Sequence, residues 1–238
     1  MLNRLRLIFT LLILIFTSAI LADNAIQSNI TTKIHQESHK NPTYEIKMAV
    51  PVMQGQAPYV QSFNQYVKSL MEKERREFID SIAGDVPPNP SAFDLKYKIL
   101  YFIPNRFVSI QFEEYSYVSG SAHPNIETYV INYDFVQNRD LNLQDLFKPE
   151  VSYLSIIANY CIKELKTRKF GAVDFIKDGA APVDRNYHDW NITKAGLLIN
   201  FDAYQVAPYV YGKQTVVIPY SYLKPYMKEE YIKLLNIQ

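Results

Sequence analysis

Alternation of apolar and polar residues on both sides of one short segment constrains the fold of this chain more than any other feature. Residues 107–117 alternate along their whole length, and the apolar residues between 129 and 135 fall on every second position. The segment between these runs, residues 118–125, is rich in turn-forming residues and reads V-S-G-S-A-H-P-N. A period of two bounded by Gly, Ser, Asn and Pro is typical of antiparallel strands. We therefore expect a turn or bulge here between two paired strands.

This segment has two interpretations that composition leaves open. As a binding loop, it offers small residues beside an imidazole; as a simple connector, it needs only the positive φ that Gly120 tolerates. Composition alone favours the connector. The candidate binding residues in this loop are Ser119, Gly120, His123, Pro124 and Asn125.

Helical periodicity in two other segments completes the predicted fold class, which is α+β. Apolar residues recur at helical spacing over 58–83 and 150–168, whereas residues 94–136 and 190–218 carry strand patterns. We predict one antiparallel sheet with the two main helices packed on it. A strand that begins near Tyr44 is expected to break at its proline, as an edge strand would.

The N-terminal residues indicate export. Two arginines precede an almost unbroken apolar run, and this run is shorter than a membrane-spanning helix requires. Residues 1–22 are therefore predicted to be a signal peptide, which places the protein in the periplasm or outside the cell. A membrane would be involved only through an uncleaved signal segment.

Composition divides the rest of the chain. Polar, aperiodic residues 23–42 are predicted to be a flexible leader, and 43–84 a small strand-helix module. The Pro- and Asn-rich residues 85–91 form the expected hinge, followed by a larger domain over 92–235.

Charge and cysteine content exclude two classes of protein. The formal net charge is only +1 and basic residues cluster only at the start of the chain, so a nucleic-acid partner is not expected. The single cysteine, Cys161, cannot form an internal disulfide, and its place in an apolar helical stripe predicts a small buried hydrophobic side chain.

No enzyme motif is present in the sequence. It contains no G-x-S-x-G, no P-loop and no H-E-x-x-H. His35 and His39 have metal-ligand spacing, but a solvated linker is the favoured interpretation because further ligands are not evident. His123 and the pair His188-Asp189 could form a base or metal site, although structural roles are favoured. We predict no catalytic residues, no metal site and no cofactor.

A second loop, residues 202–213, joins two predicted strands and is aromatic rather than polar. A connection of this length is typical of a packed lid or a recognition surface. Its candidate binding residues are Tyr204, Pro208, Tyr209, Tyr211 and Gly212.

Two sequence blocks carry a resemblance to a known family. The first runs from Ser109 through S-G-S-A-H-P-N to Phe147, and the second is W-N-I-T-K-A-G-L-L-I-N-F-D-A-Y-Q-V-A-P-Y-V-Y-G followed by V-V-I-P-Y. Together they resemble the bacterial envelope domain in the extracellular part of the anti-sigma factor RsiV. A similar domain precedes the catalytic domain of the peptidoglycan deacetylase PdaC.

The resemblance implies a partner. RsiV binds lysozyme, so lysozyme or a similar muramidase is the implied protein partner, which the chain would capture or inhibit. The chain lacks the sigma-binding segment, and it ends soon after the shared region, so we expect no signalling and no deacetylase activity. A glycan-binding module acting on peptidoglycan, and a structural envelope protein without a ligand, are the alternatives.

The two candidate loops are predicted to meet. Both interrupt strands that return to one sheet, so they could lie at the same edge. Tyr209 and Tyr211 would alternate so that at least one ring projects outward as an anchor, and His123 could contribute a hydrogen bond. The alternative, in which these residues pack the two loops together, stays open.

Overall fold

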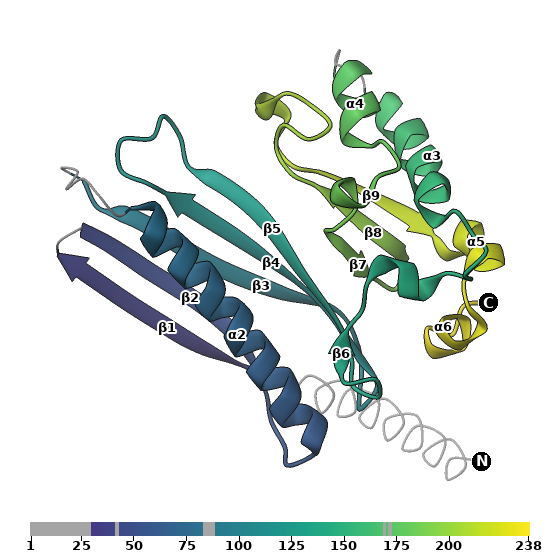
Figure 1. Ribbon diagram of the computed structural model, residues 1–238, viewed down its shortest axis with the longest axis horizontal. Helices are drawn as coiled ribbons and strands as arrows, with labels where there is room; N and C mark the ends of the chain where they lie inside the picture. The colour runs from purple at the N-terminus through teal and green to yellow at the C-terminus, as the bar shows by residue number, and fades with distance from the viewer. Residues whose placement is uncertain (1–29, 41–42, 83–88, 169, 171–172) are drawn as a thin grey trace, which may run out of the picture.

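A computed structural model describes residues 30–40, 43–82, 89–168, 170 and 173–238. The predicted signal peptide lies outside these residues. The described chain is α+β, as predicted, and its elements form two units that lie side by side in Figure 1. We call residues 30–140 the N-terminal unit and residues 143–238 the C-terminal unit.

The N-terminal unit is a six-stranded sheet in which spatial order follows chain order. Its strands are β1 (Ile30–Lys40), β2 (Thr43–Met53), β3 (Ser91–Ile103), β4 (Phe107–Tyr117), β5 (Asn125–Asp134) and β6 (Arg139–Asp140). Neighbours are antiparallel except β2 and β3, which are parallel. This exception arises because helix α2 (Pro58–Ser81) carries the chain back across the sheet between them. The β4–β5 hairpin confirms the turn expected at residues 118–125.

Helix α2 confirms the helix predicted over 58–83. Pro58 occupies its first turn, where the missing N–H removes no helical hydrogen bond. One face of α2 is buried: Val60, Phe63, Val67, Met71 and Phe78. This face packs on alternate residues of β4, namely Val108, Ile110 and Phe112, in a single apolar core. The core forms because the helical and strand periods present matching apolar surfaces.

The C-terminal unit holds a separate three-stranded antiparallel sheet covered by helices. Its strands are β7 (Trp190–Ile192), β8 (Gly196–Phe201) and β9 (Gln214–Pro219). Its helices are α3 (Tyr153–Lys166), α4 (Val173–Gly179), α5 (Tyr220–Leu223) and α6 (Glu229–Leu234). Short 3-10 turns are η1 (Leu143–Leu146), η2 (Asp184–Asn186), η3 (Tyr209–Tyr211) and η4 (Lys224–Tyr226). Helix α3 falls within the predicted range 150–168, and it packs on the sheet.

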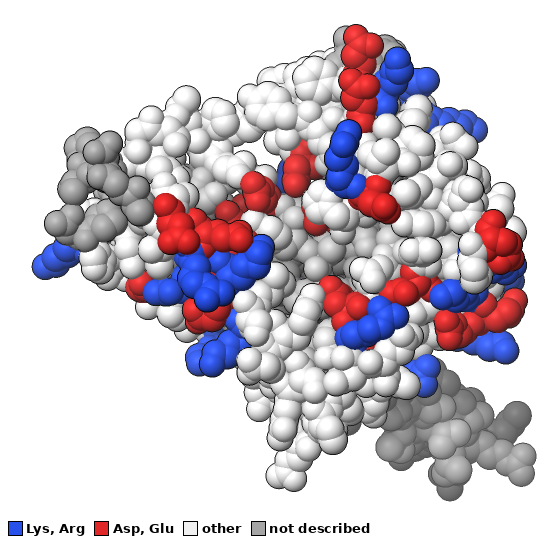
Figure 2. Space-filling model, viewed as in Figure 1, with Lys and Arg blue, Asp and Glu red and all other residues white. Residues whose placement is uncertain are grey.

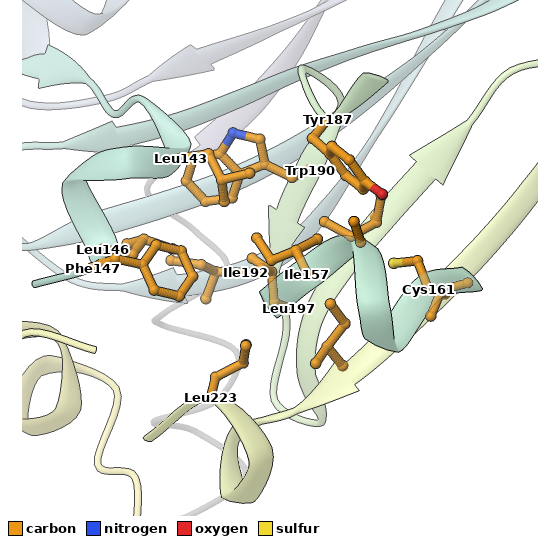
Figure 3. Close-up of a cluster of buried hydrophobic side chains, with 14 of the residues drawn as sticks. Leu143, Leu146, Phe147, Ile157, Cys161, Tyr187, Trp190, Ile192, Leu197 and Leu223 are labelled. Atoms are coloured by element: carbon orange, nitrogen blue, oxygen red, sulfur yellow. The ribbon is translucent and has the colours of Figure 1, made fainter. Parts of the chain in front are cut away.

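The core of the C-terminal unit lies between α3 and its sheet (Figure 3). Ile157 and Cys161 of α3 lie in the same cluster as Leu197 of β8, and all three are almost fully buried. Burial raises the pKa of the Cys161 thiol to about 12. The prediction of a buried hydrophobic cysteine is confirmed.

The prediction of one continuous sheet is wrong. Residues 94–136 and 190–218 belong to two sheets, because β7 meets β4 and β5 through side chains and not through a backbone ladder. The large connection from 143 to 189 forms its own helices and separates the two sheets along the chain.

The prediction of a flexible leader is wrong for residues 30–40. These residues form β1, which pairs with β2 over 11 residue pairs. Only Ile30 of β1 is buried, so this edge strand lacks the apolar alternation that marks a strand in a sequence. Strand β2 also continues through Pro51 to Met53; its pairing with β3 ends at Met48, and proline is tolerated where a strand has one neighbour.

The expected hinge at 85–91 falls inside the N-terminal unit, and its residues 85–88 lie outside the described chain. The strand and helix of 43–84 share a sheet and a core with β3, β4 and β5. The boundary between the two apolar cores instead falls after β6, with the exception of Phe107 of β4, which is buried in the second core. None of the helices in the described ranges has the length and apolar character needed to cross a membrane.

A candidate binding site where the two units meet

The two candidate loops meet in the structure. The ring of His123, from the β4–β5 loop, stacks on Tyr209 with centroids 4.6 Å apart. Tyr204 stacks on the same tyrosine at 5.1 Å. We call His123, Tyr209 and Tyr204 the ring stack. It joins the N-terminal unit to the C-terminal unit at one end of their boundary, as the sequence predicted for these loops.

The ring stack leaves an apolar tip on the second loop. Pro208 precedes the turn η3, which directs Val210 outward so that 84% of it is exposed. Tyr204 is 55% exposed and Tyr211, which packs against Phe170 at 5.1 Å, is 46% exposed. Tyr209 is half-buried by comparison. Sequence reasoning missed Val210 because an aliphatic residue between two tyrosines gives no signal until the turn is known.

Other predicted site residues hold the loops in place. The Ser119 backbone N–H donates to Ser91 Oγ at 3.0 Å, and the Asn125 amide donates to Glu127 at 2.6 Å. His123 Nδ1 lies 2.9 Å from the carbonyl oxygen of Pro124. Gly120 and Gly212 have φ of 93° and 61°, a region that glycine adopts without strain. These residues shape the loop; the exposed apolar side chains belong to the second loop.

A lysine ties the second loop to the N-terminal unit beside the ring stack. Lys213 Nζ donates to Glu113 Oε2 of β4 at 2.9 Å and to Thr128 Oγ1 of β5 at 3.1 Å. This bond to the ammonium lowers the pKa of the Glu113 carboxyl. The second loop is therefore fixed by a ring contact and by an ion pair.

Deeper between the units, the contacts are hydrogen bonds between buried polar side chains and not stacked rings. Ser109 Oγ of β4 donates to Asn132 Oδ1 of β5 at 2.7 Å, and Asn132 Nδ2 donates to the Trp190 carbonyl oxygen at 2.7 Å. Asn191 Nδ2 donates to Ser109 Oγ at 3.0 Å and to the Ile110 carbonyl oxygen at 3.0 Å. We call Ser109, Asn132, Asn191 and Asn200 the polar seam.

Asn200 extends the seam along β8. It accepts a hydrogen bond of 2.7 Å from Gln111 Nε2, and its own amide donates to Asn191 Oδ1 at 3.3 Å. All four seam side chains are essentially excluded from solvent. Because an unpaired polar group in such a place is costly, these complementary bonds fix how the units dock. The seam was not predicted from the sequence, since Asn and Ser residues usually indicate turns.

Two carboxyl groups, Asp202 of the second loop and Glu114 of β4, have raised pKa values. Burial, followed by the nearby Asp189 carboxylate, raises the pKa of Asp202 to about 6. On the α2 side of the sheet, burial raises the pKa of Glu114 to about 7, with a further contribution from Glu127 directly opposite on β5. Figure 2 shows acidic side chains lining the hollow between the two units. This hollow favours neutral or cationic groups.

The histidines that the sequence offered for a catalytic or metal site make other contacts or lie apart in the structure. His188 Nε2 lies 2.9 Å from Asp189 Oδ2, and this hydrogen bond raises the pKa of His188 to about 9. His123 belongs to the ring stack. His35 and His39 lie on β1. Within the described ranges, no group of three or more His, Cys, Asp or Glu residues is arranged to hold a metal ion.

Comparison with known families assigns the two halves of the chain to two models. Residues 37–126 match the model described as deacetylase PdaC, and residues 144–221 match the model described as a protein of unknown function, DUF3298. The first match lies within the range of the N-terminal unit, and the second lies within that of the C-terminal unit.

A curated relative matches across both regions. The peptidoglycan-N-acetylmuramic acid deacetylase PdaC of Bacillus subtilis (strain 168) is 33% identical over 171 residues, which are 70% of this chain and 36% of that protein. The chain thus spans about a third of the length of this relative.

Two solved structures share the fold. A DUF3298 family member from Bacteroides fragilis superposes with a TM-score of 0.63 at 16% identity, covering 88% of this chain and 96% of that one. A DUF3298 family protein from Pseudomonas aeruginosa PAO1 gives a TM-score of 0.59 at 22% identity, covering 84% and 93%. At these identities the similarity concerns the fold alone.

Proposed function

This chain belongs to the PdaC and DUF3298 families, and from that premise we propose that it is a non-catalytic envelope protein that captures a lysozyme-like muramidase. Capture would take place at the tip of the second loop, beside the ring stack. The predicted signal peptide and the cell-wall chemistry in the name of the Bacillus subtilis relative support a location in the periplasm or outside the cell.

The observation that carries this proposal is the rigid apolar tip. Tyr204, Val210 and Tyr211 are exposed although the loop that bears them is held by stacked rings and by Lys213. Large apolar side chains on a fixed loop bind a partner at a low cost in conformational entropy, and such residues are typical anchors of protein interfaces.

Electrostatics supports a basic partner. Asp202, at the start of the second loop, has the carboxylate of Glu127 near it, and the Lys213 ammonium is already engaged by Glu113. A muramidase with a basic surface would meet complementary charge, which increases the rate of association and orients the encounter.

The contacts of the titratable groups support the proposed non-catalytic role. His188 is held by Asp189 and by the Arg185 carbonyl oxygen, and Tyr129 donates to Glu127 at 2.8 Å. The bond to Asp189 raises the pKa of His188, and burial followed by nearby carboxylates raises the pKa of Tyr129, so both shifts have structural causes. The deacetylase activity named for the Bacillus subtilis relative belongs to a protein of which this chain spans about a third.

The test is a binding measurement with variants of the tip. We expect the double substitution Tyr204→Ala/Val210→Ala to weaken binding to lysozyme by about 2 kcal/mol, or roughly 30-fold in Kd, because it removes two anchors. Titration calorimetry against lysozyme measures this. The melting temperature should stay within about 3 °C of the parent, since both side chains are exposed.

A matched control uses another exposed valine of the same unit. Val217 on β9 is 42% exposed and lies outside the second loop, so Val217→Ala should leave the Kd unchanged. If the parent does not bind lysozyme, the proposed partner is wrong. If the parent binds but the double variant binds equally well, the proposed site is wrong.

A further inference from the structure

The two units enclose a second, deeper cleft that the proposed function does not use. It has a volume of about 540 Å³ and lies between α2, β5, the η1 turn and residues 184–190. Volumes of 300–1,000 Å³ are usual for small-molecule sites, which often form where two structural units meet. None of the residues of the apolar tip lines this cleft.

Three half-buried tyrosines give the cleft aromatic walls: Tyr66 of α2, Tyr129 of β5 and Tyr153 of α3. Each ring is held in place. Tyr66 donates to Asp140 at 2.8 Å, Tyr129 donates to Glu127 at 2.8 Å, and Tyr153 stacks on Phe147 at 5.4 Å. Fixed rings that keep part of their surface in contact with solvent provide apolar area without further ordering.

Planar polar groups line the same cleft. Tyr153 Oη donates to Asp184 Oδ1 at 2.9 Å, which fixes the plane of that exposed carboxylate. The exposed side chains of Asn142 and Gln144 also line the cleft, at the start of η1. The turn itself is held because Asp145 Oδ2 accepts from the Asn142 backbone N–H and from Arg139. Carboxylates and amides of this kind can each bond two neighbouring hydroxyls.

Charge narrows the ligand class. The lining includes four carboxylates, Asp140, Asp145, Asp184 and Asp189, and one histidine, His188. Arg139 neutralises Asp145 and His188 neutralises Asp189, which leaves the cleft with excess negative charge. Phosphate and other anions are disfavoured in such a place, whereas a neutral molecule rich in hydroxyls is not.

From these walls, polar groups and charges we propose that the cleft is a saccharide site for a short, uncharged oligosaccharide. The sugar rings lie against Tyr66, Tyr129 and Tyr153, and their hydroxyls donate to Asp184 and exchange hydrogen bonds with Gln144. The site is separate from the apolar tip, so it does not depend on the binding of a muramidase.

The experiment is a titration with chitotriose, the trimer of N-acetylglucosamine, followed by calorimetry and by fluorescence. Trp190 lines the cleft and is the only tryptophan in the chain, so its emission reports on this place alone. We expect saturable binding of chitotriose to the parent. The double substitution Gln144→Ala/Asp184→Ala should raise the Kd at least tenfold while the melting temperature is kept.

A matched control removes the same two residue types from outside the cleft. Gln61 of α2 and Asp174 of α4 are exposed and do not line it, so Gln61→Ala/Asp174→Ala should bind chitotriose as the parent does. Absence of saturable heat with chitotriose up to millimolar concentration overturns the proposal. So does an unchanged Kd in the cleft variant.

The two proposals fail independently. The tip variant Tyr204→Ala/Val210→Ala should keep its affinity for chitotriose, and the cleft variant should keep its affinity for lysozyme. A parent that binds chitotriose but not lysozyme would leave the saccharide site standing and remove the proposed capture function.

Discussion

The boundary between the two units is built in two different ways at its two ends. At the polar seam, Ser109, Asn132 and Asn191 are buried and saturated with directed hydrogen bonds. At the ring stack, His123 and Tyr209 touch face to face in a place that solvent reaches. The seam permits one arrangement of donors and acceptors, whereas stacked rings can slide with little loss of contact.

This difference separates the contact that docks the two units from the surface that we propose for recognition. A network of short hydrogen bonds in a buried place specifies the orientation of the two units, because any misalignment leaves polar groups unpaired. A surface contact between rings costs little to adjust. The buried seam thus fixes the orientation of the two units, whereas the exposed apolar tip lies beside a contact that solvent reaches.

The largest expected effect tests the seam. Asn132→Leu leaves the Ser109 hydroxyl and the Trp190 carbonyl oxygen without their partner, and we expect it to lower the free energy of unfolding by about 3 kcal/mol. Chemical denaturation measures this. Asn159→Leu, at an exposed position on α3, is the matched control and should change stability by less than about 0.5 kcal/mol. If Asn132→Leu changes the free energy of unfolding as little as the control does, the seam does not fix the docking of the units more firmly than the ring stack.

An intermediate effect concerns Glu114, which lies on the other face of β4 from Ser109. Its pKa is about 7 in the folded protein against an ordinary value of 4.5, chiefly because of burial and also because of Glu127 and Glu74. The folded state therefore holds the proton more tightly than the unfolded state. Between these two values stability falls as pH rises, and above pH 7 the loss is complete.

Glu114→Gln removes this titration. We expect the variant to be more stable than the parent by about 2 kcal/mol at pH 8 and equal to it near pH 4. Denaturation at both pH values checks the sign. Glu113→Gln is the control on the neighbouring position: the pKa of Glu113 is lowered by Lys213, so its substitution should instead reduce stability at pH 8. A Glu114 variant that is less stable at pH 8 would contradict the prediction.

The smallest effect is expected at the ring stack. His123→Ala removes one of the three rings, and we expect a loss of about 0.5 kcal/mol or less, since the position is exposed. The same denaturation experiment measures it. A loss as large as that of Asn132→Leu would mean that the ring stack fixes the units as firmly as the seam does.

The parts of the fold that the sequence predicts are those with strong periodicity. Helix α2, helix α3 and the β4–β5 hairpin follow from apolar residues at regular spacing, which burial requires. Strand β1 could not be predicted in this way, because both of its faces are mostly polar and only Ile30 is buried. A strand stabilised mainly by its backbone ladder leaves little trace in composition.

The candidate site could be predicted only in part. The contact between His123 and Tyr209 was predicted from loops at the edge of one shared sheet, whereas in the structure the two loops belong to separate sheets that dock side by side. The seam could not be predicted, because an asparagine such as Asn191 has the same sequence appearance in a buried network as in a turn. The cleft could not be predicted either: Tyr66, Gln144 and Asp184 are far apart in the chain and meet only after two separate sheets have docked.

The polar seam also bears on how the protein folds as it is made. The N-terminal unit is continuous in sequence and has an apolar core of its own, so we expect it to fold first, although its residue Phe107 is buried only in the core of the C-terminal unit. Until the second unit arrives, water can satisfy Ser109 and Asn132. Polar groups that water can satisfy attract other unfinished chains less than an apolar face does. The apolar part of this docking surface is small, since Phe107 is the one fully buried side chain that the described N-terminal unit contributes to the second core. We therefore expect the polar seam to reduce aggregation of the half-made protein.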